Sequence, residues 1–313
     1  MNRKTLSIVL FGIALFLSFV FSPREIYADS LKIRAHSAVL KNLNTGEILL
    51  SKNADRGIPP ASITKVLTLY LAFEAIEEGK AGPDDRVVIS RKASRMKGSR
   101  MYVGEGEEVQ LDDLIKGTAI VSGNDAATAI AEHVDGDVDT FVGRMNAKAR
   151  ALGMTHSHFR NPNGLPSRGQ VTTARDVLRL CESYLKRFPQ SLEIHSMTSY
   201  TFQDVTQQNS NHLLGMYPDV DGLKTGFTRK SGYHIVLTAQ RDGMRLMAVV
   251  MGAKSSSVRD REARRLIEDG FRMAHVPTPA IQKPAAGLKL EKTTGSSGSS
   301  KTSARPKNSR SRL

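Results

Sequence analysis

The spacing of apolar residues predicts strands at both ends of the chain and helices between them. Residues 36–51 alternate apolar and polar positions around Asn44-Thr45-Gly46, a pattern typical of a β-hairpin. Apolar residues then recur at helical spacing over 66–73, after two consecutive prolines. This second pattern predicts a helix with Ser62 near its start.

The middle of the chain, residues 111–188, keeps a helical period in four successive runs. Gly153 and the cluster Asn161-Pro162-Asn163-Gly164 interrupt these runs as a helix cap and a turn. The middle section is therefore predicted to be an all-helical insert.

From Thr198 onward the period changes back to that of strands, and a closing amphipathic helix follows over 263–273. The predicted late strands cover 200–202, 222–227, 233–239 and 246–251, with a turn at Asp242-Gly243 between the last two. Early strands, a helical middle and late strands predict an α+β fold. Its antiparallel sheet would be assembled from both ends of the domain, flanked by helices, with the all-helical subdomain inserted.

The two ends of the chain differ in composition from this middle. Two basic residues precede an apolar run at 6–21 and a small residue at Ala28, a pattern typical of a secretory signal peptide. An uncleaved membrane anchor is the alternative, but the run is shorter than the roughly 20 residues of a spanning helix. From Pro277 onward Pro, Gly, Ser, Lys and Arg dominate without an apolar period, which predicts a disordered tail. The predicted divisions are a signal peptide at 1–28, a folded domain at 29–276 and a tail at 277–313, in a protein exported to the periplasm or another extracytoplasmic part of the envelope.

The formal net charge of +14 comes largely from the ends of the chain. Residues 281–313 contain eight Lys or Arg and a single acidic residue, Glu291, so the folded part is only mildly basic. Nucleic acid is excluded as the expected partner because export removes it and no nucleic-acid-binding motif is present. The tail is expected to lie along anionic polymers or lipid headgroups, or to be simply solvated, so membrane association and oligomeric state stay open.

Cysteine and histidine usage argues against redox or metal chemistry. The single cysteine, Cys181, cannot form an intramolecular disulfide, and its apolar neighbours at helical spacing predict a buried small hydrophobe. The eight histidines form no His-Glu-x-x-His helix, and no cysteine cluster accompanies them. We therefore expect no metal and no cofactor.

Three short motifs carry the candidate chemistry. Ser-x-x-Lys alone is unspecific, because it also begins at Ser94 and Ser183, and Ser-x-Asn also begins at Ser51. Lys-Thr-Gly occurs once, between strand-like apolar residues, and is the most specific of the three. In chain order the motifs are Ser62-Ile63-Thr64-Lys65, Ser122-Gly123-Asn124 and Lys224-Thr225-Gly226.

Helical spacing allows the first motif to act as a nucleophile and its base. Positions i and i+3 lie on one face of a helix, so Ser62 and Lys65 can come within hydrogen-bonding distance. Lysine in water, with a pKa of about 10.4, stays charged, but burial and a second cation such as Lys224 would both lower that pKa. The alternative is an ordinary exposed helix lysine.

Over residues 35–273 the chain resembles the low-molecular-mass penicillin-binding proteins that act as serine-type D-alanyl-D-alanine carboxypeptidases. The resemblance rests on Pro-Ala-Ser-Ile-Thr-Lys at 60–65, Ser-Gly-Asn-Asp-Ala at 122–126 and Asp-Gly-Leu-Lys-Thr-Gly at 221–226. It implies a β-lactamase/transpeptidase-like fold, binding of β-lactams, and removal of the terminal D-alanine from peptidoglycan stem peptides.

The resemblance also implies roles for the catalytic residues. Ser62 would be acylated by the D-Ala-D-Ala end of the stem peptide, Lys65 would be its base, and Ser122 would relay a proton to the leaving D-alanine. The backbone N–H groups of Ser62 and Phe227 would form the oxyanion hole. Water would then release the acyl group.

The same resemblance implies a set of substrate-binding residues. Asn124 would hold the base and the substrate amide, while Lys224 and Thr225 would bind the terminal carboxylate. Gly226 would be a further substrate-binding residue. Arg259 is similar to an additional carboxylate-binding arginine, and the alternative is a surface residue paired with a neighbouring carboxylate.

Three other functions remain as alternatives. An endopeptidase that cleaves D-alanyl cross-links would use the same three motifs. A class A β-lactamase would need a deacylating glutamate, and residues 160–175 contain none. A non-catalytic peptidoglycan-binding protein of the same fold would have no physical need for all of these polar groups.

Overall fold

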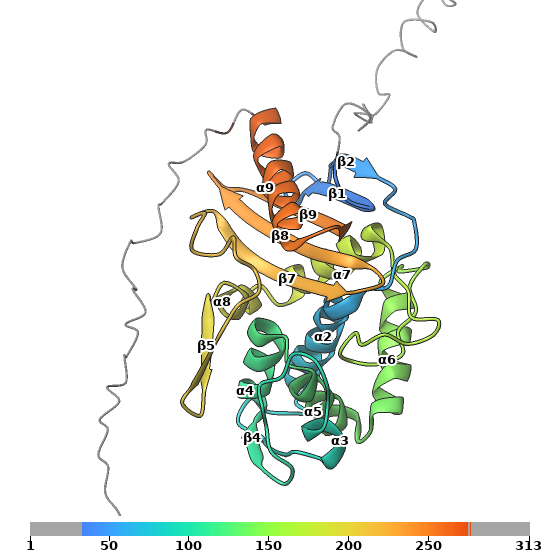
Figure 1. Cartoon of the computed structure of the whole chain (residues 1–313), viewed down its shortest axis with the longest axis vertical. Coiled ribbons are helices and arrows are strands. Elements are labelled where there is room, and N and C mark those ends of the chain that lie inside the picture. Colours follow the sequence, from blue (N-terminus) through green and yellow to red (C-terminus); the bar gives the residue numbers. More distant parts are fainter. Residues whose placement is uncertain (1–32, 275, 277–313) are drawn as a thin grey trace, which may run out of the picture. The chain divides into compact units, whose positions relative to one another are not determined.

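The computed structural model describes residues 33–274 and 276, so the predicted signal peptide and tail lie outside the described residues. Its largest sheet has five antiparallel strands in the order β2-β1-β9-β8-β7 (Figure 1). The first elements are β1 (Ser37–Asn42), β2 (Ile48–Lys52), η2 (Ala61–Ile63), α2 (Thr64–Glu77), β3 (Arg86–Val88), α3 (Arg91–Ser94), β4 (Glu108–Gln110), α4 (Leu111–Lys116), η3 (Gly117–Val121), α5 (Asn124–Asp135) and α6 (Val138–Ala151). The later elements are α7 (Ala174–Arg187), α8 (Ser191–His195), β5 (Ser199–Phe202), β6 (Val205–Gln208), β7 (Val220–Thr228), β8 (Gly232–Arg241), β9 (Met244–Ala253) and α9 (Ser256–Met273).

The sheet joins the two ends of the domain, as the sequence predicts. β1 pairs with β9 from Ser37 opposite Met251 to Asn42 opposite Leu246. The predicted early hairpin is also present, because Asn42 Oδ1 accepts the N–H of Asn44 at 2.9 Å and starts the turn into β2. The predicted α+β fold with an antiparallel sheet is confirmed.

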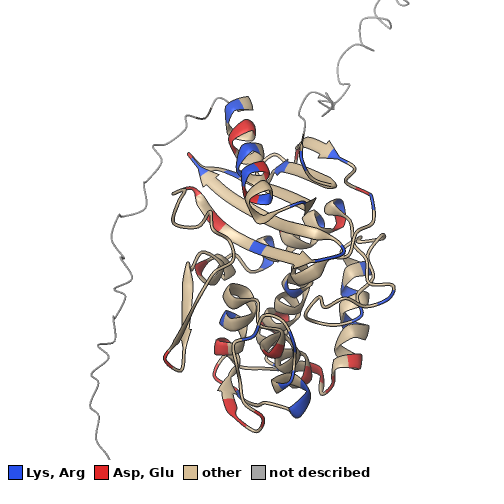
Figure 2. Ribbon diagram, in the orientation of Figure 1, with Lys and Arg blue, Asp and Glu red and all other residues tan. Residues whose placement is uncertain are grey.

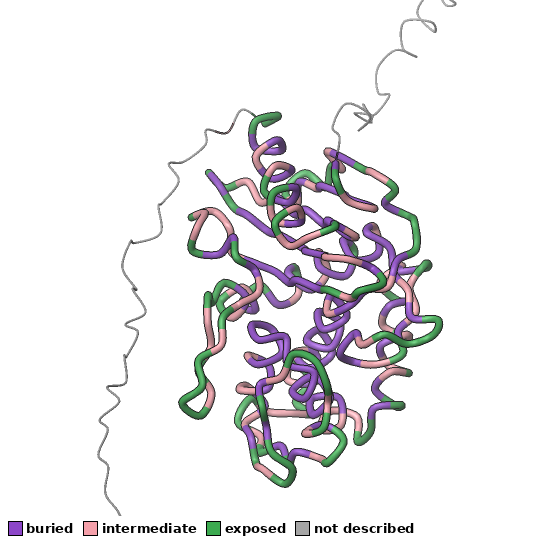
Figure 3. Tube along the Cα trace, viewed as in Figure 1, coloured by how far each residue is buried: buried purple, intermediate pink, exposed green. Residues whose placement is uncertain are grey.

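Helices cover both faces of this sheet and bury a separate apolar core on each side. On one face α9 lies across β8 and β9 (Figure 1), where Leu266 and Phe271 pack with Leu40, Leu237 and other inward-facing strand residues. On the other face lie α2, α7 and α8, above the larger core. The burial pattern of the trace follows these layers, with α2 and the central strands almost wholly buried (Figure 3).

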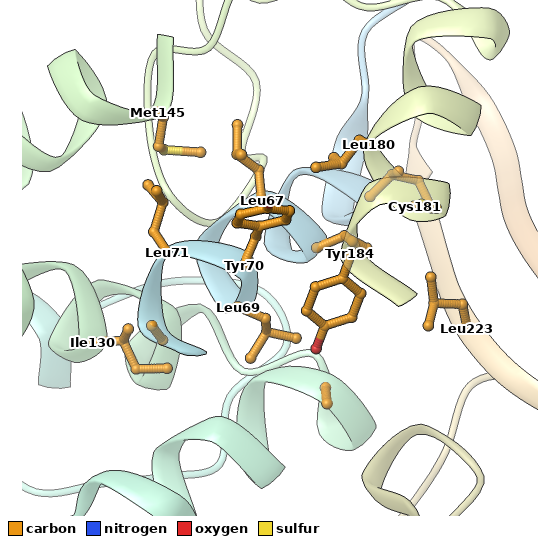
Figure 4. Close-up of a cluster of buried hydrophobic side chains, with 14 of the residues drawn as sticks. Leu67, Leu69, Tyr70, Leu71, Ile130, Met145, Leu180, Cys181, Tyr184 and Leu223 are labelled. Carbon is orange, nitrogen blue, oxygen red and sulfur yellow. The ribbon is translucent and has the colours of Figure 1, made fainter. Parts of the chain in front are cut away.

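Helix α2 passes through the larger core, which explains why it is apolar nearly all round. Leu67 and Tyr70 of α2 pack beside Leu180 and Tyr184 of α7 (Figure 4). The same cluster contains Cys181, which is fully buried, and burial raises the pKa of its thiol. The prediction of a small buried hydrophobe at this position is confirmed.

The helical middle contains the four predicted helical runs and some elements that the sequence pattern missed. Two strands of three residues each, β3 and β4, pair with each other ahead of α4. Ser94, which begins one of the other two Ser-x-x-Lys sequences, ends the short helix α3. Between α4 and α5 the chain makes a π-helical turn, η3, and β6 completes a second hairpin with the predicted strand β5.

Positive and negative side chains are distributed over the domain, and neither sign dominates. Helix α9, for example, carries both acidic and basic residues (Figure 2). No helix within residues 33–274 is long and apolar enough to cross a membrane. Across those same residues, no group of three or more His, Cys, Asp or Glu side chains could hold a metal ion.

Candidate active site

Ser62 is the middle residue of the tight turn η2 and lies two residues before Thr64, the first residue of α2. The residue before it, Ala61, has a φ of 49°, a left-handed conformation that non-glycine residues adopt only at a cost. Two glycines press against this turn from opposite chain segments. A Cβ on Gly164 would come within 1.9 Å of the Ala61 carbonyl oxygen, and one on Gly226 within 3.1 Å of the Ser62 nitrogen. The nucleophile turn, residues 60–63, is therefore held by close backbone contacts.

Lys65 is fully buried in the first turn of α2. Its Nζ lies 3.1 Å from Ser62 Oγ, 2.7 Å from Asn124 Oδ1 and 2.7 Å from the Asn163 carbonyl oxygen. Burial, and next the charge of Lys224, hold the pKa of Lys65 well below its usual value. A neutral amine has two N–H groups and one lone pair. Here both N–H groups can be donated to carbonyl oxygens, which leaves the lone pair facing the serine hydroxyl.

Asn124 begins helix α5 and also anchors the loop that forms one wall of the site. Its Nδ2 donates to the Lys97 carbonyl at 2.5 Å, and its backbone N–H donates to the Ser99 carbonyl at 2.8 Å. The next residue, Asp125, is fully buried and accepts the Met101 N–H at 3.0 Å. These bonds orient the Asn124 amide so that its oxygen faces Lys65.

Ser122 lies between η3 and α5 with a φ of 62°, again in the left-handed region. It is 5 % exposed, and its Oγ has no hydrogen-bond partner among the described residues. Ser122 and Ser62 line the same cleft. A buried hydroxyl without a protein partner next to a nucleophile is available to a substrate.

This active-site cleft has a volume of about 390 Å³. β7 supplies one wall through Thr225, Gly226 and Phe227, and α9 contributes Arg259. Lys224 is buried behind this wall, where burial and then the charge of Arg259 lower its pKa to about 7. The site therefore keeps positive charge at the Arg259 side and a neutral amine beside Ser62.

Arg259 has a feature of each of the two interpretations that the sequence left open, which were carboxylate binding and pairing with a neighbouring carboxylate. It is 4 % exposed and lines the cleft, as a carboxylate-binding residue would. Its Nε also donates to Asp260 Oδ1 at 2.7 Å, and its Nη2 donates to the Ser210 carbonyl at 3.2 Å. One face of the guanidinium is thus held by the protein.

Sequence reasoning missed His234, which supports the nucleophile turn from β8. Its Nδ1 accepts the Gly252 N–H at 2.9 Å, so the ring proton is on Nε2. Nε2 lies 3.1 Å from the Pro59 carbonyl oxygen and 3.0 Å from Ser231 Oγ, and it donates toward both. Burial lowers the pKa of His234 to about 4, so the ring is neutral.

Comparison with known proteins agrees with this geometry. A family model described as D-alanyl-D-alanine carboxypeptidase matches residues 24–255. The chain belongs to the D-alanyl-D-alanine carboxypeptidase family. The matches confirm the three predictions made from the motifs, which are the family, the fold class and the serine-peptidase activity class.

Relatives in this carboxypeptidase family match over most of the chain. The D-alanyl-D-alanine carboxypeptidase DacF of Bacillus subtilis is 35 % identical over 86 % of this chain and 71 % of its own length. DacC of Escherichia coli is 36 % identical over 83 % of this chain and 68 % of its own length. The crystal structure of penicillin-binding protein 6B from Escherichia coli superposes with a TM-score of 0.74 at 36 % identity, covering 81 % of this chain and 80 % of that one.

Two further relatives bear on what such a cleft can accept. A D-alanyl-D-alanine endopeptidase of Escherichia coli is 30 % identical over 87 % of this chain and 91 % of its own length. Penicillin-binding protein D2 of Listeria monocytogenes, solved in its ampicillin-bound form, has a TM-score of 0.71 at 30 % identity and matches 77 % of this chain and 98 % of that one.

Proposed function

We propose that this protein removes the terminal D-alanine from peptidoglycan stem peptides through an acyl-enzyme on Ser62. The observation that carries the proposal is the environment of Lys65, a buried amine that faces the Ser62 hydroxyl with two carbonyl oxygens accepting its N–H groups. An exposed lysine would stay protonated and could not remove a proton.

In the first step Ser62 Oγ attacks the carbonyl carbon of the penultimate D-alanine while its proton passes to Lys65 Nζ. The carbonyl oxygen becomes an oxyanion, for which the N–H groups of Ser62 and Phe227 are the proposed donors. Phe227 lies on β7, an edge strand of the sheet, and lines the same cleft as Ser62. An edge strand leaves alternate N–H groups free for a ligand.

The intermediate then collapses and the peptide bond breaks. The departing nitrogen of the terminal D-alanine takes a proton through Ser122, whose hydroxyl has no competing partner among the described residues. Lys65 supplies that proton and returns to its neutral form. Water then attacks the ester carbonyl and gives a proton through Ser122 to Lys65. Lys65 returns a proton to Ser62 Oγ as the ester bond breaks and the shortened peptide leaves.

The terminal carboxylate is proposed to lie against Thr225 and the cationic pair of Lys224 and Arg259. The Arg259 guanidinium is permanently charged, and Lys224 is charged in a substantial fraction of molecules near neutral pH because its pKa is about 7. Gly226 leaves room for the substrate backbone, since it has no side chain between β7 and the nucleophile turn.

β-Lactams are proposed to acylate the same serine, because they present a strained amide and a carboxylate to the same groups. The ampicillin-bound relative from Listeria monocytogenes supports this. Stem peptides are part of the cell wall, so we propose that the protein acts outside the cytoplasm.

Release of free D-alanine from a pentapeptide ending in D-Ala-D-Ala, followed by mass spectrometry, tests the proposal. We expect release of D-alanine by the parental protein and none by Ser62→Ala. From the same peptide with an amidated C-terminus, we expect much slower release of D-alaninamide, the corresponding product. An intact pentapeptide after prolonged incubation with folded protein would refute the proposed function.

A second candidate is cleavage of D-alanyl cross-links, which the likeness to the endopeptidase of Escherichia coli favours because it spans 91 % of that protein. In a cross-link the scissile bond is followed by a longer chain instead of a small terminal residue. Incubation with a purified cross-linked dimer of stem peptides, with the same Ser62→Ala control, separates the two activities.

A further inference from the structure

A second cleft lies next to the nucleophile turn and contains none of the groups assigned to the reaction. We call it the acyl-side cleft, lined by Pro59, Gly164, Arg168, Thr228 and Lys230 among others. Its volume is about 390 Å³. The proposed reaction assigns no role to this cleft.

Strand β7 leads from the active-site cleft into the acyl-side cleft. Thr225, Gly226 and Phe227 line the first, and the next residue, Thr228, lines the second. The loop before α2 connects them as well, because Ser62 lines the first cleft and Pro59 the second. An extended peptide lying along the free edge of β7 would therefore pass through both.

The direction of that peptide follows from where its carboxylate binds. With the terminal carboxylate near Arg259 and the scissile carbonyl at Ser62, the N-terminal part must run toward Thr228. Thr228 is two residues beyond Gly226, which is about 7 Å along a strand. The side chain that reaches the acyl-side cleft therefore belongs to the residue immediately before the D-Ala-D-Ala pair.

The charged residues that line the acyl-side cleft, within the part of the chain that the structure describes, are all cations. Arg168 and Lys230 are both exposed, and neither forms an ion pair or hydrogen bond through its side chain with a described residue. Among the described residues, no Asp or Glu lines the cleft. A third cation lies beside it, because Arg160 Nη2 is 3.5 Å from where a Cβ on Gly169 would be.

We propose that the acyl-side cleft is a subsite for a negatively charged side chain on the residue immediately before D-Ala-D-Ala. The proposal rests on the proposed function and narrows its substrate to acyl donors whose side chain ends in a free carboxylate. The Arg168 guanidinium offers a planar fork that suits a carboxylate, and Lys230 adds a mobile second charge from the turn between β7 and β8.

The test uses two synthetic peptides, N-acetyl-X-D-Ala-D-Ala, which differ in one group. In the first, X is 2-aminopimelic acid with a free side-chain carboxylate, and in the second that carboxylate is an amide. Free D-alanine gives kcat/KM for each. We expect the acid peptide to be preferred about three- to tenfold at low salt, and the preference to shrink at 0.5 M salt because exposed charges are screened.

The double variant Arg168→Gln, Lys230→Gln should bring the acid-to-amide ratio of kcat/KM close to one. Lys186→Gln removes one exposed cation from α7 and serves as the matched control, with the parental ratio expected. The ratio is independent of the fraction of active protein, so partial misfolding does not obscure it.

Equal kcat/KM for the two peptides in the parental protein would overturn the subsite while leaving the carboxypeptidase activity intact. The subsite would also be overturned if the double variant had the same acid-to-amide ratio of kcat/KM as the parental protein. Failure to cleave either peptide, with no acylation of Ser62 by a fluorescent penicillin, would instead refute the proposed function on which the subsite rests.

Discussion

The close contact between Gly164 and the nucleophile turn allows a sharp test of how the site is positioned. Substitution Gly164→Ala places a Cβ 1.9 Å from the Ala61 carbonyl oxygen and 2.4 Å from its carbon. Both are backbone atoms and cannot rotate away. The two segments must therefore separate by about 1 Å, and a displacement of that size at a reacting group costs about 100-fold in rate.

A matched control separates this displacement from backbone strain. Gly164 has a φ of 83° and Gly136, at the end of α5, has a φ of 81°, but a Cβ on Gly136 meets nothing within 4 Å. Alanine at either position costs roughly 1–2 kcal/mol of stability through the left-handed backbone. Only Gly164→Ala should also move Ser62.

The assay is the rate of covalent labelling by a fluorescent penicillin, with thermal unfolding measured in parallel. We expect labelling about 100-fold slower for Gly164→Ala and near the parental rate for Gly136→Ala. Labelling rates within threefold of each other would refute the claim that this backbone contact positions the nucleophile. If Gly164→Ala does not fold, Gly226→Ala gives a milder test, because its Cβ lies 3.1 Å from the Ser62 nitrogen.

Three further predictions concern protonation. Lys65→Met keeps the buried stem without a base, so labelling by penicillin should fall at least about 100-fold while the fold stays intact, and an unchanged rate would exclude Lys65 as the base. Lys224 loses its charge as the pH rises through about 7. The ratio of kcat/KM for acid-terminated peptides to that for amidated peptides should therefore fall between pH 6 and 8. A ratio that does not change with pH would contradict carboxylate binding by Lys224. His234 is neutral in the folded protein because its pKa is lowered to about 4. Its contribution to stability is therefore complete above pH 6.5 and is lost as the pH falls toward 4. The free energy of unfolding should decrease by roughly 3 kcal/mol over this range. Denaturant unfolding at pH 7 and 4.5 should show a smaller loss for His234→Asn than for the parental protein, and equal losses would contradict a buried neutral ring.

The pattern of apolar residues was sufficient to predict the long helices and strands, but it did not predict the short ones. Helices such as α2 and α7 and strands β8 and β9 carry enough apolar positions to show a clear period. The three-residue strand β3 and the five-residue turn η3 are too short for any period to be read. Their positions are set by tertiary contacts.

For the candidate site, the sequence indicated the reacting side chains, and the family resemblance added two backbone N–H groups, but the backbone carbonyl groups around Lys65 and Asn124 were not predicted. The Asn163 carbonyl that accepts from Lys65 and the Lys97 carbonyl that holds Asn124 carry no side-chain signature. Asn163 lies in a cluster that the sequence identified only as a turn. The catalytic and binding roles of the motif residues stay predictions until they are measured.

His234 shows a different limit of sequence reasoning. A lone histidine in an apolar strand is usually a buried core residue, and burial alone gives no hint of its partners. His234 is important because it contacts the carbonyl group of Pro59. Pro59 is 175 positions away in the sequence and lies just before the nucleophile turn. Only the folded arrangement brings these groups together.

The central claim is that Ser62 receives the acyl group from a D-Ala-D-Ala peptide. The most direct measurement is acid quenching of the protein during turnover of the pentapeptide, proteolytic digestion, and location of the acyl group by tandem mass spectrometry. We expect the acyl group on Ser62 and on no other residue. Release of D-alanine with the acyl group on a different residue, or with none on Ser62 at any time during turnover, would contradict it.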